Sequence, residues 1–174
     1  MTNFWLKRQY AETSTEPDGL AKRGYIYLLA EFFEIPDAAT VYFGLSTNGT
    51  SIEFQFYDLV TSLHPVKAQL IENPTCPQTP SAIVGRNLYR TGSDTHTVTF
   101  WTAASYTGGT KIASELVGAG SKAGGAAGTS RIHVLAPETH YLMSFQNTGN
   151  QPTTLHLNLG WSEGEPGARP LWTS

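Results

Sequence analysis

Large apolar side chains recur at every second position in two runs near the end of the chain, on either side of the polar stretch 147–152. Successive side chains of a β-strand point to opposite faces, so a period of two predicts strands with one buried and one exposed face. We expect a closing hairpin here, with Trp161 in the core. The large members of the pattern are Tyr141, Met143, Phe145, Leu155, Leu157, Leu159 and Trp161.

A second pair of alternating runs flanks Asn48-Gly49. Both residue types tolerate positive φ, and this dipeptide between period-two runs is a strong hairpin signal. Neither predicted hairpin can bury its apolar face alone, so we expect the two to cover each other as opposed layers. The apolar positions of this second pair are Val41, Phe43, Leu45, Ile52, Phe54 and Phe56.

Further strands are predicted elsewhere along the chain. Residues 25–35 are rich in Tyr, Ile and Phe and end at a proline, which favours one long or two short strands over an amphipathic helix. Another strand is expected between Leu59 and Ile71, with a bend or edge position at His64-Pro65. Residues 95–101, in which Val98 and Phe100 face one way, and residues 111–117 complete the set.

About eight to ten short strands separated by turn signals are typical of an all-β sandwich or barrel. We expect an all-β, two-sheet antiparallel β-sandwich of jelly-roll type. Its domain would span residues 25–163, preceded by an N-terminal arm, residues 1–24, and followed by a C-terminal tail, residues 164–174.

Two connecting segments have unusual compositions. Residues 73–80 contain three prolines, which exclude a helix or a central strand, and we expect this segment to carry the chain from one sheet to the other. Residues 118–128 contain five glycines among small and polar residues. That composition predicts a long mobile loop.

Composition narrows the functional classes. Charged residues make up 14% of the 174-residue chain, and the net charge of −3 gives no reason to expect nucleic acid or an anionic membrane as a partner. No run approaches the ~20 apolar residues of a membrane-spanning helix. Residues 1–8 lack the apolar run of a secretory signal, so we expect synthesis and retention in a cytosol-like compartment. The single cysteine, Cys76, excludes an internal disulfide and a multi-cysteine zinc site.

The residue types that support catalysis do not form a local constellation. The five histidines have no metal-binding spacing and are expected to be ordinary surface residues: His64, His96, His133, His140 and His156. Gly118-Ala119-Gly120-Ser121-Lys122 lacks the residue order of a phosphate-binding loop. Cys76 lacks a nucleophile signature, and the glutamates show no local pairing. We therefore expect no cofactor, no metal and no enzymatic activity.

Aromatic and basic side chains gather instead in the arm, the glycine segment and the tail. Such residues are enriched where proteins bind each other, although packing of the arm aromatics on their own domain is the simpler and favoured interpretation. The candidate partner-binding residues are Phe4, Trp5, Lys7, Arg8, Tyr10, Lys122 and Trp172.

Several segments together resemble small structural proteins of tailed bacteriophages. They are Arg86-Asn87-Leu88-Tyr89-Arg90, the Lys122-Ala123-Gly124-Gly125 loop, Pro137-Glu138-Thr139-His140-Tyr141-Leu142, Asn147-Thr148-Gly149 and Leu157-Asn158-Leu159-Gly160-Trp161. The likeness covers roughly residues 84–163. The chain departs from that pattern at Ser162, where a tyrosine is frequent, and in the extension that follows.

The resemblance implies a virion component: a β-sandwich on the capsid or tail that often forms trimers. The expected partners are the major capsid protein or another virion protein, together with further copies of the chain, and the expected location is the virion. The alternative is a tail- or fibre-associated module that binds carbohydrate or a receptor, which would need several exposed aromatic side chains on one face. No catalytic residues are implied.

Overall fold

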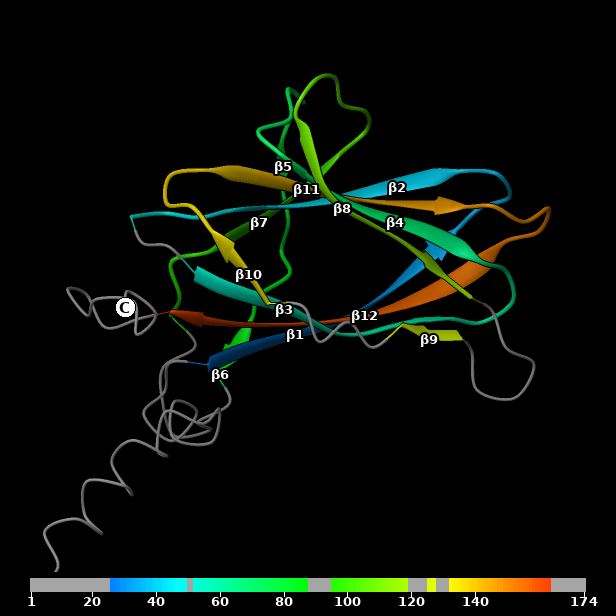
Figure 1. Ribbon diagram of the computed structural model, residues 1–174, viewed down its shortest axis with the longest axis horizontal. Coiled ribbons are helices and arrows are strands. Elements are labelled where there is room, and N and C mark those ends of the chain that lie inside the picture. The colour runs from blue at the N-terminus through cyan, green and yellow to red at the C-terminus, as the bar shows by residue number, and fades with distance from the viewer. Residues whose placement is uncertain (1–25, 50–51, 88–94, 119–124, 128–131, 164–174) are drawn as a thin grey trace, which may run out of the picture.

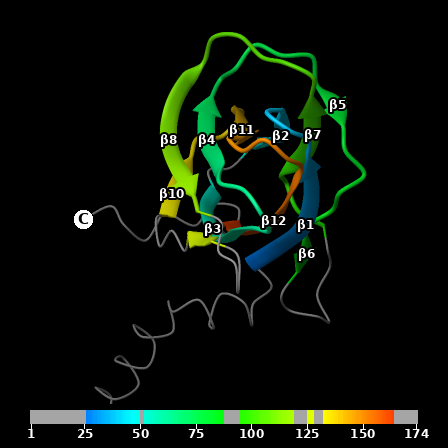
Figure 2. The same cartoon turned by 90° about the vertical axis from the view of Figure 1, so that its right-hand side faces the viewer.

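The computed structural model describes residues 26–49, 52–87, 95–118, 125–127 and 132–163. Within these ranges the chain forms twelve strands and no helix. The strands make two antiparallel sheets that pack face to face, as the views along and across the strands show (Figures 1 and 2). The predicted all-β, two-sheet sandwich is therefore confirmed.

The first sheet, sheet A, has the strand order β10-β3-β12-β1-β6, with β9 also paired to β3. Its central strand, β12, is paired along its length with β1 on one side and β3 on the other. The strands of sheet A are β1 (Ile26–Ile35), β3 (Ile52–Thr61), β6 (Arg86–Asn87), β9 (Gly125–Ala127), β10 (Ile132–Leu135) and β12 (Thr153–Glu163).

The second sheet, sheet B, has the strand order β5-β7-β2-β11-β4-β8. β11 occupies a central position between β2 and β4. The strands of sheet B are β2 (Thr40–Ser46), β4 (Val66–Glu72), β5 (Thr79–Pro80), β7 (Thr99–Ala103), β8 (Thr110–Val117) and β11 (His140–Asn147).

The pairing is nested in chain order, from the first and last strands inward. β1 pairs with β12, β2 with β11, β3 with β10, and β4 with β8. A long antiparallel ladder of this kind, rolled so that successive pairs alternate between two sheets, is a jelly roll. β5, β6 and β7 are inserted between β4 and β8, and they extend the two sheets on the β2 and β1 sides.

Both predicted hairpins are wrong in their pairing, although their strands are right. β11 lies in sheet B and β12 in sheet A, and the two strands that flank Asn48-Gly49, β2 and β3, are likewise divided between the sheets. Two strands with one apolar face each can bury those faces by pairing within a sheet or by facing each other across a core. The period of two is the same in both arrangements. Gly49 does adopt positive φ, at 76°, within a connection between sheets.

Two predicted connections also differ from the structure. The proline segment 73–80 does not change sheets, because Thr79–Pro80 pairs with β7 at the far edge of the sheet that contains β4. The chain crosses to sheet A after Pro80. The glycine segment is not one long loop, because Gly125–Ala127 pairs with β3 through Leu59, Val60 and Thr61.

The predicted strand positions are otherwise found. Residues 26–35 form one strand, and Val98 and Phe100 are buried while Thr97 and Thr99 are exposed. The predicted strand between Leu59 and Ile71 begins only at Val66, since Leu59 still belongs to β3. The arm and the tail lie outside the described residues.

The core lies between the sheets and follows the predicted phase. In β12 the side chains of Leu155, Leu157 and Leu159 are 0% exposed and Trp161 is 2% exposed. Their neighbours His156 and Asn158 are half-buried on the outer face. Facing residues from sheet B include Phe43, Leu45, Tyr141, Met143 and Phe145.

Candidate functional site

The candidate partner-binding residues predicted from the sequence lie outside the described residues, but their points of attachment are described. Ile26, where the arm joins, is directly opposite Ser162, beside which the tail leaves. The segment that contains Lys122 departs from Gly118 and returns at Gly125, and both glycines contact Thr61. Thr61 lies opposite Leu155, about 20 Å along β12 from Ser162. The candidates therefore attach at two opposite ends of the sandwich (Figure 1).

The end where arm and tail attach is built from aromatic rings. Tyr27 and Trp161 stack with centroids 5.6 Å apart and planes 17° apart. His96 meets both rings edge-on, at 5.5 Å from Tyr27 and 5.3 Å from Trp161, and Phe100 meets Trp161 at 5.5 Å. The Tyr27 hydroxyl donates to the carbonyl of Thr95 at 2.8 Å. This cluster fixes the strands from which arm and tail depart.

Glu163 ties the same end together. This residue is buried, with 8% of its surface exposed. It accepts the backbone N–H of Thr97 at 2.9 and 3.0 Å, the N–H of Val98 at 3.4 Å and the indole N–H of Trp161 at 3.0 Å. A buried carboxylate is costly unless it is hydrogen-bonded, and these donors supply the bonds. We missed this role in the sequence, although residue 163 continues the inward phase of Leu159 and Trp161.

A second polar chain lies on the outer side of sheet B. The indole N–H of Trp101 donates to the Ser46 hydroxyl at 2.9 Å, and that hydroxyl is 2.7 Å from Nδ1 of His140. Because the oxygen accepts from Trp101, its own hydrogen can be donated to a neutral His140. A serine beside a histidine is the start of a nucleophile pair. Ser46, however, is 5% exposed and held by Trp101, so the arrangement fits a structural hydrogen-bond chain.

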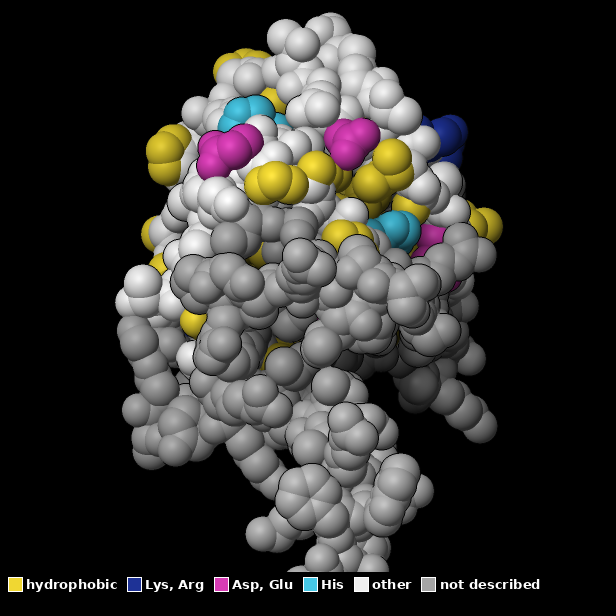
Figure 3. Space-filling view, turned by 60° about the vertical axis from the view of Figure 1, so that its left-hand side comes forward, with side chains coloured by type: hydrophobic (Ala, Val, Ile, Leu, Met, Phe, Trp, Pro, Cys, Tyr) yellow, Lys and Arg dark blue, Asp and Glu magenta, His cyan; other side chains and the backbone are white. Residues whose placement is uncertain are grey.

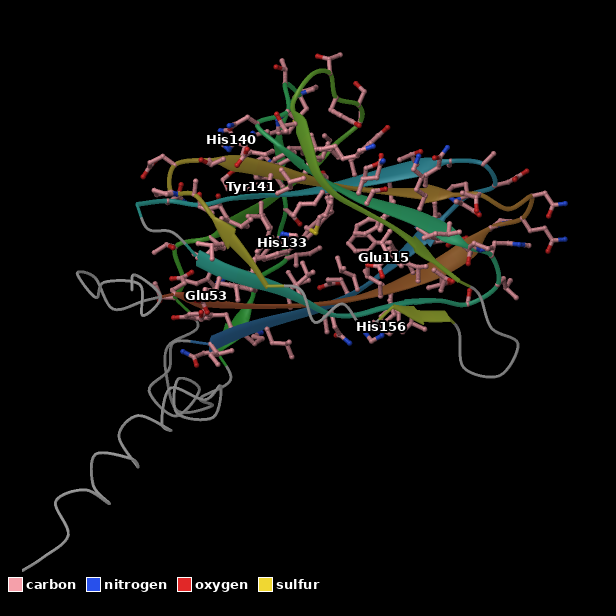
Figure 4. All side chains as sticks on the ribbon, viewed as in Figure 1. Glu53, Glu115, His133, His140, Tyr141 and His156 are labelled. Atoms are coloured by element: carbon pink, nitrogen blue, oxygen red, sulfur yellow. The ribbon has the colours of Figure 1, made fainter. Side chains whose placement is uncertain are left out.

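The histidines are dispersed, and one differs from our expectation. His133, His140 and His156 project from three different strands (Figure 4). His96 is no ordinary surface residue, since it is half-buried among Tyr27, Phe100 and Trp161. No group of three or more His, Cys, Asp or Glu side chains among the described residues could hold a metal ion.

Two titratable groups have raised pKa values. Burial raises the pKa of Tyr141, and Glu72, whose carboxylate accepts the Tyr141 hydroxyl at 3.0 Å, raises it further. The same hydroxyl accepts the N–H of Ala136 at 2.9 Å, which acts in the opposite direction. Burial also raises the pKa of the Cys76 thiol, which disfavours the reactive thiolate. Tyr141 and Cys76 therefore have structural roles in the packing of the fold.

The described surface offers few features that would attract a charged or aromatic ligand. On the face in Figure 3, acidic, basic and apolar side chains lie scattered among uncharged atoms. Phe32 is 69% exposed and stacks on His156, with centroids 4.4 Å apart. Among the aromatic side chains whose exposure is described, a set that does not include Phe56 and Tyr57, it is the one classed as exposed.

Comparison of the chain with models of known protein families and with curated proteins finds no match. In the ranges that the structure describes, no helix has the length and apolar character needed to cross a membrane.

Proposed function

We propose that this protein is a non-enzymatic structural component of a tailed-phage virion, specifically a decoration protein on the capsid surface. It would bind the major capsid protein or another virion protein through its arm, its tail and the segment that contains Lys122. It would act as a homo-oligomer, with a trimer favoured by the resemblance to phage structural proteins.

The observation that carries the proposal is the common origin of arm and tail. Ile26 and Ser162 are paired, and the adjacent aromatic cluster and the Glu163 hydrogen bonds brace that end of the sandwich. Two aromatic-containing segments anchored side by side on a braced end suit attachment to a larger surface. Jelly rolls occur in viral capsid proteins and in lectins, so the fold is compatible with this role without requiring it.

The carbohydrate-binding alternative ranks second. Glycan recognition through stacking needs exposed rings arranged together, and Phe32 is the one exposed ring among the aromatic side chains whose exposure is described, which do not include Phe56 and Tyr57. A glycan array with full-length protein would restore this alternative if it gave saturable binding.

The decisive experiment is to purify particles with the gene intact and with it disrupted. We expect a fixed number of copies per capsid subunit by quantitative mass spectrometry. We also expect extra density on the head in a comparison of the two particle projections. Absence of the protein from purified particles would refute the proposal, and density on the tail would refute the capsid assignment.

Variants then test the attached segments. Trp172→Ala and Lys122→Glu should each lower the occupancy of added protein on stripped particles, because aromatic and basic anchors at interfaces often contribute about 2 kcal/mol, or roughly 30-fold in affinity. Leu63→Ala is the matched control, since Leu63 is 64% exposed in the connection between β3 and β4. Equal occupancy for all three variants would argue against binding through these segments.

A further inference from the structure

The edge of β1 is incompletely paired. β12 pairs with β1 from Ile26 to Ile35, but on the opposite edge β6 pairs with Tyr27 and Leu28 only. Among the described residues no strand pairs with that edge from Leu29 to Ile35. Alternate backbone N–H and C=O groups of a strand point to each edge, so this stretch presents unpaired groups that can accept another strand.

The core is also less well covered beside this edge. The inward-facing side chains of β12 are fully buried, whereas the inward-facing Glu31 and Phe33 of β1 are only half-buried. Phe33 contacts the rings of Phe43 and Phe145, so it belongs to the core. Glu31 lies on the same face, and no hydrogen bond or ion pair joins its carboxylate to a described residue. A half-buried carboxylate in this position favours a cationic partner.

We propose that residues 4–10 of the N-terminal arm form an additional strand, antiparallel to β1, on the edge from Leu29 to Ile35. Every second residue of this segment of the same chain is Phe4, Leu6, Arg8 and Tyr10. Arg8 would supply the cationic partner that Glu31 lacks among the described residues. The inference does not rest on the proposed virion role, although it turns Phe4, Arg8 and Tyr10 inward and leaves Trp5 and Lys7 as the residues of the arm that a partner could contact.

One register matches both faces of β1. Arg8 would lie opposite Glu31, with apolar residues opposite apolar residues on either side of this pair on the inner face. On the outer face Lys7 would lie opposite the exposed ring of Phe32, where a cation–π contact is favourable. The complete set of pairs is Tyr10–Leu29, Gln9–Ala30, Arg8–Glu31, Lys7–Phe32, Leu6–Phe33, Trp5–Glu34 and Phe4–Ile35.

The neighbouring registers match less well. A shift of two residues in either direction places Leu6 or Tyr10 opposite Glu31 and moves Arg8 opposite Leu29 or Phe33. A shift of one residue places Gln9 on the inner face, opposite either Leu29 or Glu31. Each alternative removes the single inward Arg–Glu pair, so the sequence specifies the register through charge as well as through the apolar pattern.

The connection permits docking within one chain. Residues 11–25 would link Tyr10 to Ile26, and fifteen residues reach about 50 Å when extended. The required span, from a strand beside Leu29 back to Ile26 around β6, is about 15 Å from the spacing within and between strands. Tethering gives the arm an effective concentration in the millimolar range at this edge, which favours it over the arm of another copy. Docking leaves Trp5 and Lys7 on the outer face, where a partner can still reach them.

A disulfide cross-link tests the pairing. In the full chain with Cys76→Ser, the pair Lys7→Cys and Phe32→Cys should oxidise to a bond within one chain. The pair Lys7→Cys and Val134→Cys should not, because Val134 is 63% exposed on β10 at the opposite side of sheet A. No bond in the first pair, equal bonding in both pairs, or a bond only between chains would each overturn the proposal.

A charge exchange tests the register without new cysteines. Arg8→Glu should speed hydrogen exchange about tenfold at those amides of residues 29–35 that point to the open edge, as expected for loss of a charged hydrogen bond that holds the strand in place, while the amides bonded to β12 should not change. Glu31→Arg should do the same, and the double variant should restore slow exchange. The matched control combines Arg8→Glu with Glu34→Arg and should not restore it. Unchanged exchange in Arg8→Glu, rescue by the control, or exchange rates that depend on protein concentration would contradict docking within the chain.

Discussion

The outer faces of the two sheets contrast sharply. The outer face of sheet B bears a second small core of Ile71, Trp101 and Leu142, against which Cys76 and Tyr106 pack. The outer face of sheet A, around His156 and Asn158, is half-buried and polar, with the exposed ring of Phe32 beside it.

The difference arises because Trp101 packs closely against Gly44 and is itself covered by other residues. The Trp101 ring lies flat over Gly44, where an added Cβ would come within 2.3 Å of ring carbons. Glycine therefore makes room for tryptophan on the outside of sheet B, and Cys76 from the proline segment and Tyr106 from the connection after β7 pack against the cluster around it. An amphipathic strand pattern identifies one buried face, but a connecting segment can bury the other face as well.

The largest effect should come from a charge on the inner face of sheet A. Leu157→Asp places an unpaired carboxylate among fully buried leucines and should destabilise the fold by more than about 4 kcal/mol. His156→Asp, on the outer face of the same strand, should cost less than about 1 kcal/mol. Chemical denaturation of both variants measures the contrast, and comparable losses would refute the assigned faces.

The next effect compares the two outer faces directly. Trp101→Ala should destabilise the protein by about 3–5 kcal/mol, because it removes the centre of the second core. Phe32→Ala, on the outer face of sheet A, should change the free energy of unfolding by less than about 1 kcal/mol. Thermal melts of the two variants provide the measurement. A loss for Phe32→Ala as large as that for Trp101→Ala would show that sheet A is covered too.

The smallest effect concerns the polar chain on the outer side of sheet B. Ser46→Ala removes the acceptor of the Trp101 indole N–H and the hydroxyl beside His140, and it should cost about 1–2 kcal/mol by leaving a buried donor unpaired. Ser114→Ala is the control, since Ser114 is exposed on β8. Equal stability of the two variants in urea titrations would mean that the hydrogen bonds of Ser46 to Trp101 and His140 contribute nothing to the stability of the protein.

Local signals were sufficient for the strands and for much of the core. The period of two identified the inward positions of β12 and the burial of Val98 and Phe100, because burial of one face dictates side-chain type directly. The same reasoning failed for Asn48-Gly49 and for residues 147–152, where a turn signal cannot distinguish a hairpin from a connection between sheets. The proline segment excluded a central strand correctly, but its destination depended on contacts distant in sequence.

For the candidate site, the sequence did not predict where individual polar residues lie in the fold. The histidines were expected at the surface, yet His96 is enclosed by rings from β1, β7 and β12 that only folding brings together. Glu163 continued the inward phase, but its donors, Thr97 and Val98, are more than sixty residues away in sequence. A carboxylate on an apolar face is anomalous until those donors are known.

By itself the sequence determined the all-β class, the positions of most strands and which side of each strand faces the core. These properties depend on alternation within a few residues. Only the tertiary structure decided the nested pairing of β1 with β12 and β2 with β11, the cover over Trp101 and the open edge of β1. These depend on which distant segments meet, because backbone pairing accepts almost any strand and the choice rests on the packing of the whole chain.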